Sequence, residues 1–332
     1  MTRQTNDLSS RLKLIAVVVT YNRLAKLKLT ISHLLENAPH ALDTIVVVNN
    51  ASTDGTAEWL DTVTDPRVDV MTSTRNLGGA GGFEKGLRRA FGHHHADWAV
   101  VMDDDAWAEV GAFESFVTSA PDENTAVAAA VYYPDGRICE MNRPSENPFW
   151  HPRIFLRTLV KGRDGYHIPH DAYSAPTPHP IDLTSFVGLF ISRQMVEVAG
   201  YPDPGLFIYG DDVIYTLGLR KQGFKINFDP ALRFVHDCTT FTPGQKKTYT
   251  PLWKVYYAYR NGLMMYRRAG GIMFWALLPL LLIQWKRVAN RYGDNRDKYE
   301  RLRKIGIRDG LRRCSKRSHA EVLEIMNGRD AG

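Results

Sequence analysis

Short apolar runs alternate with amphipathic stretches along the first hundred residues. Three runs rich in Val, Ile, Ala and Met stand at residues 13–20, 45–48 and 98–102. Because these runs are apolar at successive positions, they predict strands that are buried on both faces. Helical spacing of apolar residues predicts helices between the runs, at residues 24–36, 56–63 and 82–91. The alternation indicates a mostly parallel sheet flanked by helices, and therefore an α/β, Rossmann-like fold.

The second half of the chain is less regular. Residues 132–180 are rich in Pro, His, Asn and Gly, which predicts long loops with short elements. Strands are expected at 185–192, 224–228 and 232–235, and a helix is expected at 213–222. The pattern then becomes helical and basic. We divide the chain into a polar tail over 1–12, a main domain over 13–242 and a basic helical region over 243–332.

Composition and charge narrow the class of protein. The 332 residues are 44% hydrophobic and 23% charged, which is typical of a folded protein. The three cysteines lie far apart, so we expect reduced thiols and a cytoplasmic location, and the polar start predicts no secretory signal. The net charge of +6 is uneven, because residues 246–332 hold 20 Lys and Arg against 7 Asp and Glu. An acidic body with a basic tail favours a polyanionic partner, either nucleic acid or an anionic membrane.

Three adjacent carboxylates, Asp103, Asp104 and Asp105, directly follow the third apolar run. Such carboxylates repel one another unless a cation neutralises them. Ligands bind at the carboxyl ends of parallel strands, and carboxylates with substrate phosphates suit Mg²⁺ or Mn²⁺. A metal site is therefore predicted here, with a solvated acidic turn as the alternative.

Other segments could carry chemistry as well. Residues 75–83, Arg-Asn-Leu-Gly-Gly-Ala-Gly-Gly-Phe, could bring backbone close to an anionic ligand, or could simply form a tight turn. Asp211 and Asp212 follow another apolar run, where a carboxylate could act as a general base or could cap a helix. His236 could be a metal ligand or a structural histidine.

Together these segments resemble the family 2 glycosyltransferases of the GT-A fold. The resemblance is carried by Val17-Val-Val-Thr-Tyr-Asn-Arg23, Val47-Val-Asn-Asn-Ala-Ser-Thr-Asp-Gly-Thr56, residues 75–83, Asp103–Asp105, and Gly210-Asp-Asp212 with His236. Arg75–Phe83, Leu206–Asp211 and Tyr259-Arg-Asn261 also resemble the actinobacterial galactofuranosyltransferases that start galactan on a lipid-linked acceptor. The resemblance covers residues 13–262, which makes 13–242 the catalytic domain.

The resemblance implies a nucleotide-sugar site and a divalent metal, Mn²⁺ or Mg²⁺. The residues implied at the nucleotide are Thr20, Tyr21, Arg23, Asn49, Arg75, Asn76, Gly78, Gly79, Asp103 and Asp104. The implied metal ligands are Asp105, Asp103 and His236. Asp212 would be the catalytic base, with Asp211 as the near alternative. The family often has Asp where this chain has Asn49, at the position that reads the uracil edge, so the donor base stays open.

The resemblance implies an inverting hexosyltransferase that moves galactofuranose from UDP-galactofuranose onto a polyprenyl-diphosphate-linked glycan during cell-wall synthesis. Rhamnosyl or other hexosyl transfer from a dTDP- or UDP-sugar is the alternative. A nucleotidyl transferase and a sugar-nucleotide-binding scaffold with an inactive site are the rivals from other classes. The acidic body offers no basic channel for nucleic acid, so we expect no nucleic-acid partner.

Residues 269–285 carry no formal charge and stand between basic pairs. At ~1.5 Å per residue a helix of this length is shorter than the ~30 Å hydrocarbon core of a bilayer. We therefore expect an interfacial segment, with a buried or subunit contact and a membrane span as alternatives. With the basic helices it predicts peripheral attachment to the inner face of the cytoplasmic membrane. Homo-oligomer formation stays open.

Overall fold

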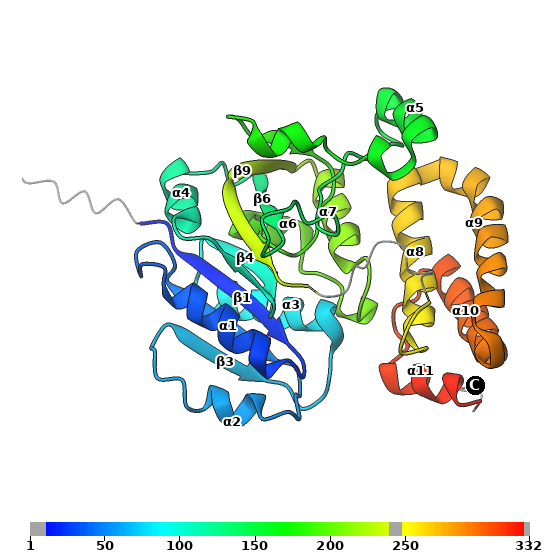
Figure 1. The fold of residues 1–332 in the computed structure, drawn as a ribbon, viewed down its shortest axis with the longest axis horizontal. Coiled ribbons are helices and arrows are strands. Elements are labelled where there is room, and N and C mark those ends of the chain that lie inside the picture. Colours follow the sequence, from blue (N-terminus) through cyan, green and yellow to red (C-terminus); the bar gives the residue numbers. More distant parts are fainter. Residues whose placement is uncertain (1–10, 239–247, 329–332) are drawn as a thin grey trace, which may run out of the picture.

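The computed structural model describes residues 11–238 and 248–328 (Figure 1). Most of the predicted tail over 1–12, and the predicted boundary at 242, lie outside the described residues. The strands and helices of residues 11–238 form one body, and the C-terminal helices stand beside it (Figure 1).

One mixed, mostly parallel sheet of nine strands runs through the body. The strands are β1 (Leu14–Thr20), β2 (Thr44–Asn49), β3 (Val68–Thr72), β4 (Trp98–Asp103), β5 (Ala106–Ala108), β6 (Thr125–Tyr132), β7 (His179–Ile181), β8 (Leu189–Ser192) and β9 (Lys225–His236). Their order is β3-β2-β1-β4-β8-β6-β9-β5, with β7 beside β9. Strands β1 to β4 pair in parallel, whereas β8 is antiparallel to β4 and β6. The three apolar runs of the first hundred residues are thus confirmed as neighbouring strands.

The two short strands predicted at 224–228 and 232–235 are one strand, β9. Its pairing with β6 shifts between Ala129 and Ala130, which face Asp229 and Arg233 respectively. The intervening residues bulge out, so the strand continues past Pro230. The strand predicted at 185–192 is also shorter than expected, because only Leu189–Ser192 pairs.

Helices cover both faces of the sheet. They are α1 (Leu24–Leu35), α2 (Thr56–Leu60), α3 (Gly78–Arg88), α4 (Ala112–Ser119), α5 (Pro152–Lys161), α6 (Arg193–Ala199) and α7 (Asp211–Lys221) in the body. Side chains of β1 alternate between the layers: Ile15 and Val17 pack with α3, α6 and α7, whereas Leu14 and Ala16 pack with α1 and α4. Two buried layers explain why these strands are apolar at every position.

The glycine cluster forms the start of helix α3, which corrects the prediction of a loop before a helix at residue 82. A Cβ at Gly82 would lie 2.4 Å from Val19 Cγ1, and one at Gly86 would lie 2.3 Å from Val17 Cγ1. The glycines therefore let α3 pack directly on β1. Gly78 has φ +72°, and a Cβ there would lie 2.1 Å from the carbonyl oxygen of Phe207.

The C-terminal helices have a core of their own. They are α8 (Lys254–Gly270), α9 (Phe274–Val288), α10 (Arg296–Leu311) and α11 (His319–Met326). Tyr256, Tyr257, Tyr299 and Val322 are fully buried there, together with Phe207 from the body. The predicted basic helical region is thus present, and it is joined to the body through Phe207.

The stretch Lys254–Arg291 is long and apolar enough for a membrane-spanning helix, with a mean hydropathy of 1.4 over its best window. It does not run straight, because Gly271 breaks it with φ 53° and α9 turns back along α8. The rings of Tyr259 and Trp285 lie 4.6 Å apart, whereas a continuous helix would separate them by about 39 Å. The apolar segment is therefore one arm of a hairpin.

Candidate active site

The candidate site lies where several strands of the sheet end. Thr20 of β1 is paired with Asn49 of β2, and Asp103 of β4 is paired with Val19. Parallel strands bring these carboxyl ends to the same edge, where ligands bind in open α/β sheets. The predicted site residues from three separate segments are therefore neighbours.

Two of the three adjacent carboxylates are held by the β1–α1 connection. Thr20 Oγ1 donates to Asp104 Oδ2 at 2.7 Å, and Thr30 Oγ1 donates to the Asp104 carbonyl at 2.8 Å. The Arg23 guanidinium donates to Asp105 Oδ2 at 2.7 Å and to Asp104 Oδ1 at 3.3 Å. Asp104 is buried in these contacts, so its carboxylate anchors the turn beneath the site.

Strand pairing brings His236 to Asp105. Ala106 of β5 is opposite His236 of β9, and His236 Nε2 lies 3.1 Å from Asp105 Oδ1. One ligand atom each from Asp103, Asp105 and His236 lie within 4.8 Å of one another. Two carboxylates and an imidazole are a donor set that Mn²⁺ or Mg²⁺ accepts, so these residues fit a divalent cation.

Burial and mutual repulsion set the protonation of this cluster. Burial raises the pKa of Asp103 to about 7, with the neighbouring carboxylates adding to the effect. Burial likewise raises the pKa of Asp104 to about 6. For His236, burial opposes the charged form, but the bond to Asp105 and the nearby carboxylates raise its pKa to about 10. The Asp105 pKa is lowered despite burial, because it pairs with His236 and Arg23. Burial therefore disfavours the ionised form of Asp103 and Asp104, and a bound cation would favour it.

Asp211 and Asp212 form the first turn of α7. Gly210, with φ 72°, precedes them as the N-cap, so neither aspartate caps the helix. Burial raises the pKa of both carboxyls, to about 6 for Asp212 and well above the ordinary value for Asp211, which also feels Asp212 and Asp103. Burial therefore favours the protonated form of both carboxyls.

The loop before α7 is clamped by two side chains of α8. Asn261 Nδ2 lies 2.9, 2.8 and 2.9 Å from the carbonyl oxygens of Leu206, Ile208 and Tyr209. Arg260 is fully buried without a carboxylate partner among the described residues. Its guanidinium donates to the Gly205 carbonyl at 2.7 Å and to the Leu206 carbonyl at 2.9 Å. The side chains of the Tyr259-Arg-Asn261 segment therefore hold the loop that precedes the Gly-Asp-Asp segment, which explains why the two segments occur together in the chain.

Two cavities meet at Asp212. The smaller, of about 370 Å³, is lined by Gly79, Asp103, Asp211, Asp212 and His236 among others. The larger, of about 530 Å³, contains Asp212, Arg143, Thr158 of α5 and Ala269 of α8. Asn142, Met141 and Ser185 line both. Asp212 thus lines both the smaller cavity, which contains Asp103 and His236, and the larger cavity.

The structure gathers some of the predicted site residues and leaves others apart. Gly78 is buried against Phe207, and Arg75 and Tyr21 are exposed at the rim of the site. Asn76 Oδ1 accepts from the Gly78 N–H at 2.8 Å, so it shapes the start of α3. Asn49 is fully buried, its Oδ1 accepts from Ser52 N–H at 3.0 Å, and its Nδ2 has no partner among the described residues.

Asn142 is a site residue that the sequence did not reveal. Its Oδ1 lies 2.7 Å from His236 Nδ1, and its Nδ2 donates to Ser185 Oγ at 2.8 Å. It stands in the irregular segment 132–180, where no periodicity or motif marks it. The loop-clamping roles of Arg260 and Asn261 also needed the fold, because these residues are about fifty positions from the loop that they hold.

Comparisons with known proteins identify the family of this chain. Residues 15–175 match the family model described as glycosyl transferase family 2. Galactofuranosyltransferase GlfT1 of Mycolicibacterium smegmatis is 27% identical over 315 residues, which cover 90% of this chain and 97% of that protein. Undecaprenyl-phosphate mannosyltransferase of Micrococcus luteus is 30% identical over 183 residues, which cover 52% of this chain and 70% of that protein.

The fold also matches a solved glycosyltransferase. The crystal structure of GalNAc-T7 with UDP, GalNAc and Mn²⁺ superposes with a TM-score of 0.53 and 15% identity, covering 96% of this chain and 58% of that one. The expected GT-A arrangement, a mostly parallel sheet between helices with a helical region at the C-terminus, is thereby confirmed. By sequence, by fold and by the carboxylates gathered at its strand ends, the chain belongs to glycosyl transferase family 2.

Proposed function

We propose that this glycosyltransferase is a metal-dependent, inverting hexosyltransferase that uses a nucleotide sugar and a lipid-linked acceptor. The observation that carries the proposal is the position of Asp212. It lines both the smaller cavity, which contains Asp103 and His236, and the larger cavity, which reaches α5 and α8. A carboxylate between a donor pocket and an acceptor cavity is where a base for direct displacement is needed.

Asp103, Asp105 and His236 would hold Mn²⁺ or Mg²⁺, which supplies positive charge next to the departing diphosphate. Arg23 keeps Asp105 in place through its 2.7 Å contact, and Asp104 anchors the turn from below. No protonated side chain is then required at the leaving group. Consequently one carboxylate on the acceptor side suffices, unlike in glycoside hydrolases, which need two.

Asp212 is the better candidate for the base. Asp212 lines both of these cavities, whereas Asp211 lines only the smaller of the two. Ionised Asp212 can then remove the proton of the acceptor hydroxyl, an effect worth about 10²–10⁴-fold in rate. Attack by that oxygen on the anomeric carbon breaks the bond to the diphosphate and inverts the configuration.

The position of the larger cavity supports an acceptor that is delivered from a membrane, because the cavity reaches Thr158 of α5 and Ala269 of α8. Beside Thr158, the α5 side chains Leu156, Leu159 and Val160 are 63%, 68% and 85% exposed.

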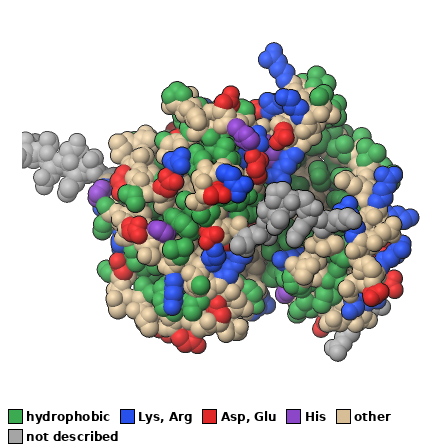
Figure 2. Space-filling view, in the orientation of Figure 1, with side chains coloured by type: hydrophobic (Ala, Val, Ile, Leu, Met, Phe, Trp, Pro, Cys, Tyr) green, Lys and Arg blue, Asp and Glu red, His purple; other side chains and the backbone are tan. Residues whose placement is uncertain are grey.

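Beyond Ala269, the α8–α9 turn and α9 expose Ile272, Trp275, Leu280 and Ile283. Lys and Arg side chains stand out along the C-terminal helices and on α5 (Figure 2). Exposed apolar side chains next to basic ones favour the anionic inner face of the cytoplasmic membrane.

For the donor we propose UDP-galactofuranose, and for the product a cell-wall glycan, on the strength of the GlfT1 relatives, which align with nearly the whole chain. The Micrococcus luteus relative favours a second candidate, mannosyl transfer to a polyprenyl phosphate. That relative aligns with about half of the chain, so we place it second. Asn49, with its unpartnered Nδ2, leaves room for a donor base other than uracil.

A donor screen tests the proposal. The full chain is incubated with UDP-, dTDP- and GDP-sugars, with and without Mn²⁺, and with polyprenyl-phosphate- and polyprenyl-diphosphate-linked acceptors. Mass spectrometry should detect a hexose added to the diphosphate-linked acceptor, only with metal, and not with Asp105→Ala or Asp212→Ala. Nucleotide-sugar binding without transfer to any acceptor would instead support an inactive binding protein.

A further inference from the structure

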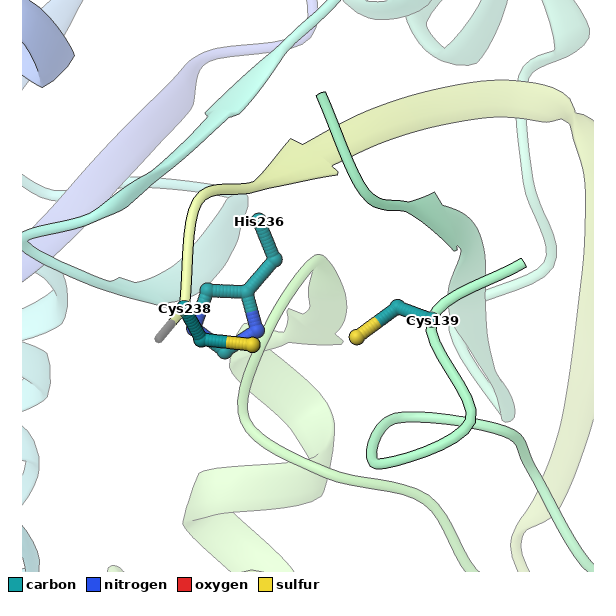
Figure 3. Close-up of side chains that lie close together, drawn as sticks. All are labelled: Cys139, His236 and Cys238. Carbon is teal, nitrogen blue, oxygen red and sulfur yellow. The ribbon is translucent and has the colours of Figure 1, made fainter. Parts of the chain in front are cut away.

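A second cluster of metal-ligating side chains lies on the far side of His236. Cys139 follows β6, His236 ends β9, and Cys238 lies two residues further along the chain. One ligand atom from each lie within 4.8 Å of one another. In the close-up, both sulfur atoms and a ring nitrogen of His236 point into the same small space (Figure 3).

The imidazole of His236 faces two different environments. Its Nε2 lies 3.1 Å from Asp105 Oδ1, on the side of the proposed donor site. Its Nδ1 lies 2.7 Å from Asn142 Oδ1, and the same oxygen lies 3.0 Å from Cys139 Sγ. Nδ1, the two sulfurs and the Asn142 oxygen therefore belong to one group, which is separate from the carboxylates.

The geometry points to a thiolate metal site, formed by Cys139, Cys238 and Nδ1 of His236, that takes Zn²⁺. Zinc with Cys and His ligands is tetrahedral, with bonds of about 2.3 Å to sulfur and about 2.0–2.1 Å to nitrogen, so its ligand atoms lie roughly 3.5–3.8 Å apart. Closing the cluster from within 4.8 Å needs a movement of about 1 Å. Asn142 Oδ1 or a water would take the fourth position.

Two features of the surroundings suit a metal. A histidine that binds a metal usually donates its other N–H to a carboxylate, and Asp105 already stands at Nε2 in that position. Cys139 is fully buried and His236 is 2% exposed, so water competes little for the site. Binding would displace the proton on Nδ1 of His236 as well as the thiol protons, and would leave a neutral imidazole with its remaining proton on Nε2.

The cluster could instead form a disulfide. That bond requires the two sulfurs to approach to about 2.05 Å, whereas a shared tetrahedral zinc holds them about 3.8 Å apart. The reaction would also need an oxidant, and the chain shows no other group of cysteines to supply one: Cys314 lies after α10, away from the pair. We therefore prefer metal binding, and the test distinguishes the two.

One consequence rests on the proposed function. A neutral imidazole offers a single lone pair, so His236 can bind a cation through Nδ1 or through Nε2, with the proton on the other nitrogen. Zinc at the thiolate site would thus withdraw His236 from the donor-site cation. We expect Zn²⁺ to inhibit transfer and a zinc chelator to restore it, in the wild type but not in a Cys238→Ser variant.

Cobalt titration tests the site without any assumption about transfer. The full chain, reduced and stripped of metal, is titrated with Co²⁺, which reports thiolate ligands by a charge-transfer absorption in the near ultraviolet. We expect one equivalent of Co²⁺ with that absorption, displaced by Zn²⁺. Cys139→Ser and Cys238→Ser should each lose the absorption, while Cys314→Ser, the matched control, keeps it.

A second measurement needs no variant and therefore does not depend on variants that fold. Zn²⁺ should slow alkylation of Cys238, the partly exposed thiol of the pair, at least tenfold, as followed by peptide mass spectrometry, and should leave Cys314 unchanged. The proposal is overturned if the cobalt absorption is absent, if it survives in either serine variant, or if zinc does not protect Cys238. Two results together would show a disulfide instead: the isolated protein has a mass lower by two hydrogens, and the reduced protein takes up no metal. Inhibition by zinc that persists in Cys238→Ser would refute only the link to catalysis.

Discussion

Replacing Asn261 with Ala should release the loop that positions Asp211 and Asp212. The Leu206 carbonyl keeps its donor, because Arg260 also binds it, but the Ile208 and Tyr209 carbonyls lose theirs. A buried carbonyl without a donor costs about 1–3 kcal/mol. Since water can reach Tyr209, which is 37% exposed, we expect a total of about 2–4 kcal/mol.

That loss is comparable to the strain that the clamp opposes. Phe207 and Tyr209 have φ of 65° and 70°, in the left-handed region, where each non-glycine residue costs of order 1–3 kcal/mol. Without Asn261 the loop can relax, and the relaxation carries the start of α7 with it. We therefore expect kcat to fall at least tenfold, while metal binding by Asp103, Asp105 and His236 is retained.

The assay compares Asn261→Ala with Asn290→Ala, an exposed asparagine of the same helical region. Thermal unfolding should show a decrease in Tm of roughly 3–6 °C for the first, and no more than about 1 °C for the second. Turnover is measured with the donor identified by the screen. Wild-type turnover and wild-type Tm in Asn261→Ala would refute the reasoning. A loss of Mn²⁺ binding that matches the loss of turnover would show general damage rather than a displaced loop.

Three further results are expected. Transfer should become slower as the pH drops through about 6, because Asp212 then takes up its proton and can no longer act as a base. A rate that stays constant between about pH 5 and 8 would exclude Asp212 as the base. Between its ordinary pKa of 3.8 and about 7, Asp103 is protonated in the folded protein but ionised in the unfolded chain. Its contribution to the stability of the metal-free protein is therefore lost as the pH rises through that range. Mn²⁺ should therefore raise Tm more at neutral pH than near pH 5, and Asp103→Asn should abolish the difference; an equal rise at both pH values would contradict the assignment. Val160→Glu should weaken binding to anionic liposomes in a flotation assay, whereas Val110→Glu, at an exposed valine beside α4, should not; equal binding by both variants would argue against α5 as a membrane contact.

Much of the fold, and the position of several carboxylates of the candidate site, could be predicted from the sequence. The apolar runs at 13–20, 45–48 and 98–102 are strands because side chains on both of their faces are buried, and that requirement is visible along the chain itself. Asp103 and Asp105 could be found because they directly follow such a strand. Carboxylates this close along the chain repel one another in any fold, so the sequence alone was enough to predict a cation between them.

Other features depend on distant segments and could not be predicted. The glycines at 78–82 belong to a helix because Val19 and Phe207 leave no space for side chains there, and neither neighbour is local. The two predicted strands after residue 224 are one, since β6 continues to pair beyond the bulge.

The sequence by itself determined the alternation of three apolar strands with helices in the first hundred residues, the carboxylates after the third strand, and the division into an acidic body and a basic C-terminal region. These depend on short-range periodicity and on residue type, which the chain states directly. Only the tertiary structure decided that the apolar segment after residue 269 folds back on α8, that Asn142 contacts His236, and that two cysteines a hundred residues apart meet at one histidine. Such contacts join residues that are far apart along the chain, and they follow from strand pairing and core packing rather than from any local pattern.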